Sequence, residues 1–241
     1  KTISNGLNLS TDGGLVWIKV RSQAQHHALF DTERGATKYL KSSATSAEAT
    51  RTDTLTSFNS NGFSLGNDSS GALVNTSGQT YASWTFKKKA KFFDVVTWTG
   101  NGTAGRTISH NLGTTVGCVM IKNTSNAENW MVYHIGSGID GQLNLNTNAA
   151  AVDESSQFND TVPSSTVLTL GANSEVNYNG QTYVAYLFAH DTDASSLIKC
   201  GSYTGTGSAN NAVTLGWEPQ WLMVKSASGT GSVQNWDMFD N

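Results

Sequence analysis

A segment of five residues occurs three times in this chain at a constant spacing, and this repetition constrains the fold more than any other feature. Residues 15–19 (LVWIK) recur as 118–122 (CVMIK) and as 221–225 (WLMVK), each 103 residues after the one before. A period near 100 residues is longer than the 20–50 residues of a solenoid unit and matches a whole small domain. The sequence therefore predicts tandem domains rather than a stacked superhelix.

Three further markers return in the same order at nearly the same spacing. They are residues 78–86 with 180–188, residues 98–102 with 203–207, and residues 27–30 with 130–133 and 236–239. Four markers in one order at one period are not expected by chance. They divide the chain into a first repeat over residues 1–91, a second over residues 92–196 and the first half of a third over residues 197–241.

Both ends of the chain fall out of phase with the period. The first repeat lacks a counterpart of residues 98–102, so its first strand is missing, and the third lacks a counterpart of residues 78–86. The chain also begins at Lys1 without a Met, which suggests processing or a fragment of a longer array. Half a domain leaves an apolar face and strand edges uncovered. We therefore expect a partner chain or a missing continuation to cover residues 197–241.

The markers have the pattern of β-strands. Along residues 80–86, Ala82, Trp84 and Phe86 share one face, and bulky residues recur at their counterparts, so this face is predicted to be the core. Residues 16 and 18 are aliphatic in every repeat and are also predicted to point inward. Their strand carries Trp17 on its opposite face, with Met at both counterparts, so that face is expected to be at least partly covered.

Turn signals separate these strands. Asn-Gly or Asp-Gly pairs favour positive φ and tight hairpins, and they occur at residues 5–6, 12–13, 61–62, 101–102, 140–141 and 179–180. Short strands with such turns predict an all-β fold of tandem antiparallel β-sandwich repeats, jelly-roll-like, with about eight strands in each period. The Ala-rich stretches 42–50 and 146–152 are compatible with either a short helix or a loop.

Composition excludes several classes of protein. Charged residues make up 14% of the chain against a usual ~25%, and the net charge of −3 gives no sign of nucleic-acid binding. No run approaches the ~18 apolar residues that a membrane-spanning helix needs, so membrane insertion is not expected. The two cysteines cannot form a disulfide framework, and Cys118, inside an apolar run, is predicted to be a buried free thiol.

Several polar residues are candidates for a metal-binding or catalytic site. His26 and His27 with Asp31 and Glu33 suggest a metal site, but their spacing fits no ligand motif and His27 occupies a position that is Trp in the other repeats. The P-loop, the dinucleotide-binding glycine motif and the nucleophile elbow are all absent from the sequence. The sequence therefore assigns no catalytic, cofactor-binding or metal-binding residue, expects no cofactor, and leaves ligand-binding residues unknown.

Paired acids for glycoside hydrolysis occur by residue type only. Asp153 with Glu154 is interpreted as a solvated loop, and Asp191 with Asp193 lies between repeats. Acids on neighbouring strands can meet without any sequence signature, so this class of enzyme stays open.

Basic and aromatic residues each have a structural and a functional interpretation. Lysines 87–89 and 91 form the only basic run, and a solvated linker at a strand end is favoured over a nucleic-acid surface. Trp98, Trp130, Tyr203 and Trp236 are able to stack on sugar rings, but aromatics that return in strand register are more often core.

The phrases at residues 14–19, 57–66 and 107–113 (GLVWIK, SFNSNGFSLG and TISHNLG), with 28–35 and 92–102, resemble a repeat found in virion structural proteins of tailed phages, especially marine ones. The resemblance covers nearly the whole chain. It implies a non-enzymatic tail-fibre-like or particle-surface protein on the virion. Its implied partners are other virion proteins, further copies of the chain in a homo-oligomer and, for host attachment, host-surface glycans.

Two other functions stay open beside this one. The chain has the features of a carbohydrate-binding module of an extracellular protein, and a β scaffold is also compatible with a glycan depolymerase. The resemblance implies no chemistry for particular residues, and it does not place the protein on the tail or on the capsid.

Overall fold

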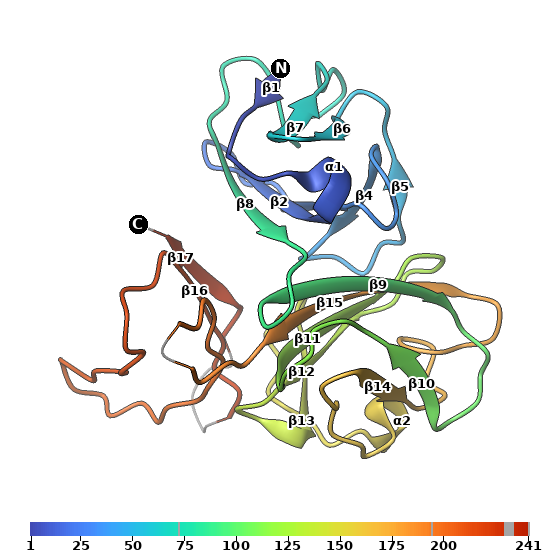
Figure 1. The fold of residues 1–241 in the computed structure, drawn as a ribbon, viewed down its shortest axis with the longest axis vertical. Coiled ribbons are helices and arrows are strands. Elements are labelled where there is room, and N and C mark those ends of the chain that lie inside the picture. Colours follow the sequence, from blue (N-terminus) through green and yellow to red (C-terminus); the bar gives the residue numbers. More distant parts are fainter. Residues whose placement is uncertain (72, 194, 229–233, 241) are drawn as a thin grey trace.

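The computed structural model of the chain describes residues 1–71, 73–193, 195–228 and 234–240. These residues form an all-β structure of antiparallel sheets (Figure 1). The described helices, α1 (Leu9–Asp12) and α2 (Ser155–Phe158), have four residues each. The predicted all-β class is therefore confirmed. None of the helices in the described ranges has the length and apolar character required to cross a bilayer.

A five-stranded sheet and a three-stranded sheet lie face to face in the first part of the chain (Figure 1). The large sheet has the order β5-β4-β3-β2-β8 and the small one the order β1-β7-β6. The strands are β1 (Thr2–Ile3), β2 (Gly14–Val20), β3 (Ala28–Asp31), β4 (Lys38–Lys41), β5 (Ala49–Thr50), β6 (Leu55–Asn59), β7 (Gly62–Leu65) and β8 (Tyr81–Lys87). Because β2 is covered on both faces, its sequence is an almost continuous apolar run.

A second five-stranded sheet follows, with the order β13-β12-β11-β15-β9, and a two-stranded sheet β10-β14 lies beside it (Figure 1). The strands are β9 (Phe93–Thr99), β10 (Arg106–Ser109), β11 (Val116–Asn123), β12 (Trp130–His134), β13 (Gly138–Asn144), β14 (Val167–Leu170) and β15 (Thr182–Ala189). β9 pairs with the outer edge of β15, whereas β8 is itself the edge strand of the first sheet.

Strands that the sequence period relates pair in the same register. β2 pairs with β3 and β8, and β11, one period later, pairs with β12 and β15. Trp17 lies opposite Trp84, and its counterpart Met120 lies opposite Tyr186. β1–β7 and β10–β14 are related in the same way by a shift of 105 residues.

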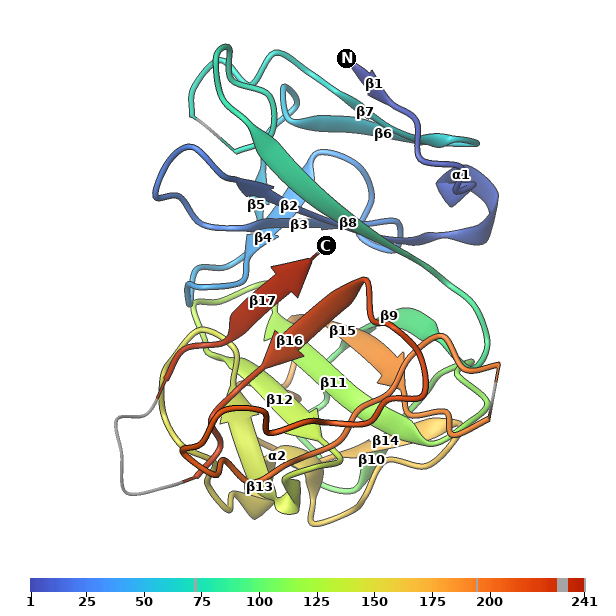
Figure 2. The same ribbon diagram turned by 90° about the vertical axis from the view of Figure 1, so that its left-hand side faces the viewer.

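The last described strands form a single hairpin, β16 (Trp221–Val224) and β17 (Asp237–Asp240), which lies on the face of the second sheet opposite the β10–β14 sheet (Figure 2). Met223 lies opposite Met238, as Trp17 lies opposite Leu29 in the first sheet. The hairpin therefore has the register of β2–β3 and of β11–β12.

The lysine that ends each copy of the five-residue marker closes the loop after its strand. Lys19 donates to the carbonyl of Gln25 at 2.8 Å, and Lys122 donates to the carbonyl of the next residue at 2.8 Å. Lys225 donates to the carbonyl of Gln234. Burial lowers the pKa of all three side chains, to about 8 for Lys122. A hydrogen-bonding role thus explains why the lysine is part of the repeat.

Each large sheet packs one face against its own small sheet. In the first pair, Val16, Ile18 and Phe30 contact side chains of β6 and β7. In the second pair, Val119 and Ile121 pack with side chains of β10 and β14. The aliphatic positions 16 and 18 and their counterparts therefore point into these two separate cores, as predicted.

The opposite faces of both large sheets meet in a third apolar cluster, which we call the shared core. The hairpin β16–β17 contributes one of its faces to the same cluster. Its members include Leu15, Trp17, Leu29, Phe86, Cys118, Met120, Trp130 and Tyr186, with partly buried Trp84, Trp221, Met223, Trp236 and Met238. Cys118 is a buried free thiol, as predicted, and burial raises its pKa.

The shared core corrects the prediction for residues 80–86. Trp84 and Phe86 do point into a core, but it is the shared core and not the one that Val16 and Ile18 fill. The sequence shows that both faces are covered, but it does not show that they belong to different cores. The face carrying Trp17 is covered, as expected.

The predicted turns are confirmed in part. Glycines 6, 13, 62, 102 and 180 have positive φ, whereas Gly141 lies within β13, because that strand continues through the Asp-Gly pair. Gly62, with φ +112°, begins β7, and a Cβ there would lie 2.1 Å from the carbonyl oxygen of Ile3. The Ala-rich stretches 42–50 and 146–152 are loops, with β5 ending the first, so the helix alternative is wrong for both.

Candidate functional site

A pocket of about 110 Å³, which we call the junction pocket, opens where the first sheet, the second sheet and the hairpin meet. Its walls combine aromatic rings with small polar groups, namely Trp17, His27, Ser43, Asn146, Asn235 and Trp236. This combination offers a flat apolar surface beside amide and hydroxyl groups. The volume is well below the ~300–1,000 Å³ of typical small-molecule sites. The pocket is therefore too small to enclose a ligand of ordinary size.

His27 is held in the pocket by two indole rings. The Nε1 of Trp17 donates a hydrogen bond to the Nδ1 of His27 at 2.8 Å, and the ring of Trp84 stacks on His27 at 6.3 Å. Burial, with smaller effects of Lys19 and His26, lowers the pKa of His27 to about 4. His27 is therefore neutral at pH 7, and because its Nδ1 accepts, its Nε2 carries the proton.

The four aromatic residues considered as sugar-stacking groups have different environments. Trp98 and Trp130 are buried in cores, as the structural interpretation predicts. Trp236 lines the junction pocket and donates from its Nε1 to the carbonyl of Asn144 at 2.9 Å. Tyr203 is 56% exposed. Of this set, Trp236 thus lines a pocket, and Tyr203 lies on the open surface.

The four side chains that suggested a metal site in the sequence have separate partners in the structure. His26 contacts Ser43, while His27 contacts Trp17. Asp31 forms a buried ion pair with Arg34. Glu33 forms an ion pair with Lys88, the residue after β8. These side chains point to different partners, so the described geometry does not gather them around one position.

The acid pairs considered for glycoside hydrolysis are also engaged separately. Glu154 accepts a hydrogen bond from Ser156, and both Asp153 and Glu154 are exposed, as a solvated loop predicts. Asp193 pairs with Lys91 at 2.9 Å. Neither pair lines the junction pocket.

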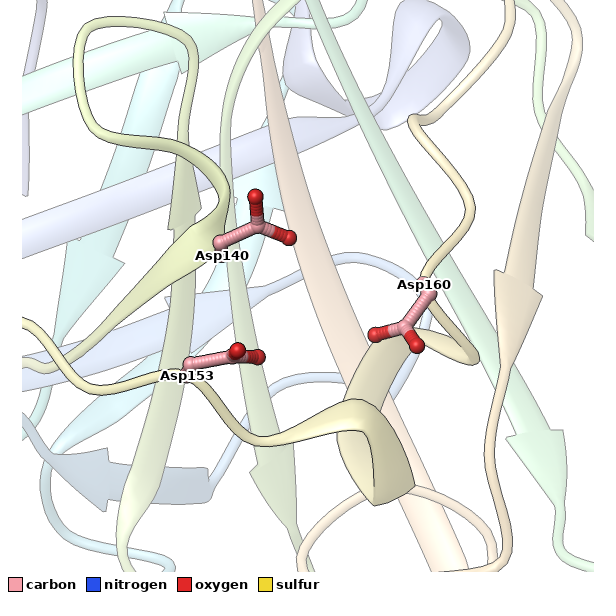
Figure 3. Close-up of side chains that lie close together, drawn as sticks. All are labelled: Asp140, Asp153 and Asp160. Atoms are coloured by element: carbon pink, nitrogen blue, oxygen red, sulfur yellow. The ribbon is translucent and has the colours of Figure 1, made fainter.

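One acidic cluster was not found from the sequence. Asp140 on β13, Asp153 before α2 and Asp160 after α2 offer carboxylate oxygens that all lie within 4.8 Å of one another, and all three are exposed (Figure 3). Hard cations prefer such oxygens, and Ca²⁺ takes six to eight of them, so three carboxylates form an incomplete ligand set. No sequence signal predicts this cluster, because its members come from three separate segments.

A buried ionic network joins the two large sheets. Arg34 donates to Asp31 at 2.5 Å, to Glu48 at 3.1 Å and to the hydroxyl of Tyr186 at 3.2 Å. The Tyr186 hydroxyl donates in turn to Asp31 at 2.8 Å. Burial by itself would lower the pKa of Arg34, but Tyr186, Asp31 and Glu48 outweigh it and raise that pKa. Burial also raises the pKa of Tyr186.

The basic run lies beside a groove of about 460 Å³ next to α1. Lys87 pairs with Asp12 at 3.0 Å, and Lys88 pairs with Glu33 at 2.8 Å across this groove. Lys88 also contacts the buried Asp94 at 3.2 Å. Carboxylates therefore neutralise much of the positive charge of the run.

Comparisons with known proteins identify one family. A family model described as "Domain of unknown function (DUF7483)" matches residues 2–241. No curated protein and no solved structure matches the chain.

Proposed function

The chain belongs to the DUF7483 family, and we propose that it is a non-enzymatic structural protein of a tailed-phage virion. In this proposal it forms a fibre or surface appendage of the particle and contacts glycans on the host surface. It is a tandem array of β-sandwich repeats over residues 1–91, 92–196 and 197–241. The observation that carries the proposal is the shared core, in which equivalent faces of all three repeats pack together.

The shared core supports a stiff appendage. Three copies of one strand pair bury the same face in one cluster, and the Arg34 network ties the first sheet to the second. Such packing holds the three repeats against one another, so the array is expected to keep its shape as it lengthens. Antiparallel strands with short turns also resist proteolysis at loop tips. These properties suit a projection that works outside a cell.

The junction pocket supports contact with glycans. Trp236 brings an aromatic ring to the pocket wall, and the exposed Asn235 brings an amide that can pair with hydroxyl groups. A pocket this small binds one sugar weakly. Repetition on a homo-oligomeric particle compensates, because linked weak sites raise avidity about 10²–10⁴-fold.

Immunoelectron microscopy tests the structural role. Antibodies against the chain are expected to label intact particles, with the label gathered on a tail or surface projection. Particles treated with pre-immune serum are the control. If intact virions remain unlabelled while infected-cell lysates contain the protein, the proposal is wrong.

The second candidate is a carbohydrate-binding module of another extracellular protein, and the junction pocket is the observation that favours it. A glycan array probed with the native chain and with Asn235→Ala separates a binding module from an inert spacer, because Asn235 lines the pocket and is exposed. Asn211→Ala, at an exposed position outside the pocket, is the matched control. New reducing ends after incubation with host polysaccharide would instead indicate a depolymerase.

A further inference from the structure

The hairpin β16–β17 is fixed on the rest of the molecule by one of its faces. Trp221 and Met223 pack into the shared core, where the ring of Trp221 meets the ring of Phe86 edge-on at 5.4 Å. The indole of Trp236 donates to the carbonyl of Asn144, and the amide of Ala151 donates to the carbonyl of residue 227 at 2.8 Å. These contacts define which face and which edge of the hairpin remain outside.

The outer face of the hairpin exposes side chains whose counterparts are fully buried. Leu222 and Phe239 lie directly opposite each other, and they are 41% and 58% exposed. The counterpart pair in the first sheet, Val16 and Phe30, has no exposure at all. In the second sheet the counterpart of Leu222 is likewise fully buried. The outer face therefore has the sequence of a core but is open to solvent.

Comparison with the two large sheets also shows which strand β16 has no counterpart of among the described residues. β2 lies between β3 and β8, and β11 lies between β12 and β15. β16 pairs only with β17 among the described residues, so the edge that β8 or β15 would occupy is open. An open strand edge with an apolar face favours pairing with another strand.

Two apolar residues outside the hairpin, Tyr203 and Val213, are also exposed where their counterparts are covered by strands. Tyr203 is 56% exposed, whereas its counterpart Trp98 is 8% exposed and stacks on Tyr183 of β15 at 5.4 Å. Val213 is 51% exposed, whereas the residue 105 positions earlier, Ile108, is 8% exposed and pairs with β14. The exposed apolar positions of residues 197–241 thus correspond to positions that strands like β15 and β14 cover.

We infer that the open edge of β16 binds an antiparallel strand of the repeat's own type, supplied by a partner segment with the pattern Gly-Gln-Thr-Tyr followed by alternating apolar residues. β8 and β15 share this pattern, and each pairs with the counterpart of β16. The register follows from β11–β15, in which Val119 lies opposite Leu187. Leu222 is therefore paired with the partner position that corresponds to Leu187. The inference does not depend on the function proposed above.

A synthetic peptide with the sequence of residues 180–190 tests this inference on the complete chain. Fluorescence anisotropy of the labelled peptide is expected to show saturable binding to the native protein. Leu222→Lys is expected to weaken binding about tenfold or more, because a charge replaces a leucine that the peptide buries. This change leaves the fold intact, since Leu222 is already exposed. Val152→Lys, at an exposed position outside the hairpin, leaves binding unchanged.

Cross-linking tests the register. With oxidised glutathione as the oxidant, a chain with Leu222→Cys is expected to form a disulfide with the peptide carrying cysteine at position 187, because residues directly opposite in a strand pair have suitable Cα distances. Cysteine at position 186 or 188 of the peptide points to the other face and reacts much less. The native chain, with its buried Cys118 and partly buried Cys200, is the control.

Three outcomes would overturn the inference. The first is no peptide binding by the native chain, and the second is equal cross-linking at all three peptide positions. The third is a dimer of the chain, seen by sedimentation without peptide, that Leu222→Lys dissociates. In that case a second copy covers the face instead of a strand of the repeat.

Discussion

Removing the charge of Arg34 is expected to destabilise the whole protein, because this side chain neutralises a carboxylate that has no access to water. In Arg34→Met the buried Asp31 keeps two hydrogen bonds, from the Tyr186 hydroxyl at 2.8 Å and from the backbone N–H of residue 34 at 2.9 Å. It loses its counter-ion at 2.5 Å. Breaking a buried pair by removing one partner costs about 3–5 kcal/mol, which is a large part of a typical stability of about 5–15 kcal/mol.

Urea unfolding followed by tryptophan fluorescence measures this loss. Lys91→Met is the control, because the Lys91–Asp193 pair has a similar length but is more than half exposed, and no measurable loss is expected there. Adding Asp31→Asn to Arg34→Met is expected to recover much of the loss, since it removes the unpaired buried charge. The reasoning is refuted if Arg34→Met costs less than about 1 kcal/mol, or if Asp31→Asn recovers nothing.

Three further changes test other features. The pKa of His27 is lowered to about 4, so between pH 6.5 and pH 4 the unfolded chain binds a proton at this residue that the folded chain does not bind. The free energy of unfolding is therefore lost as pH falls through this range, and the loss is expected to be smaller in His27→Gln. Identical curves of urea midpoint against pH for the two proteins would contradict this. Gly62→Ala is expected to lower Tm by several degrees, because its Cβ would meet a carbonyl oxygen at 2.1 Å. Gly205→Ala, which meets nothing within 4 Å, leaves Tm unchanged or raises it, and equal Tm values for the two variants would refute the strain argument. Lys122→Met is expected to cost about 1–3 kcal/mol in urea unfolding, because it removes the ammonium donor from the carbonyl of the buried Asn123 at the end of β11. An unchanged midpoint would show that the lysine is dispensable.

The repetition of the sequence predicted several of the strands. Alignment of residues 15–19 with 118–122 identified β2 and β11, and the aligned partners lie in matching registers in the structure. Such prediction works because a strand shows itself in the local alternation of its side chains. The His27 position was also correctly aligned with Trp130 and Trp236.

The contacts between sheets could not be predicted in the same way. Arg34 and Tyr186 are 152 residues apart, and no periodic pattern relates them because the counterpart of Arg34 in the second repeat is a serine. Asp140 and Asp160 come together although they lie on separate segments, on β13 and after α2. A sequence pattern records which face of a strand is apolar, but it does not record which other element covers that face.

The shared core also determines how the protein can be divided. A cut near residue 91 follows the period of the sequence, but it would expose Leu15, Trp17 and Leu29, which are buried against the second sheet and the hairpin. Fragments made at such boundaries are expected to expose apolar surfaces and to aggregate, even though the cut follows the period of the sequence. The repeating unit of the sequence is smaller than the packed unit of the structure, and heating should therefore unfold neighbouring copies in a single transition.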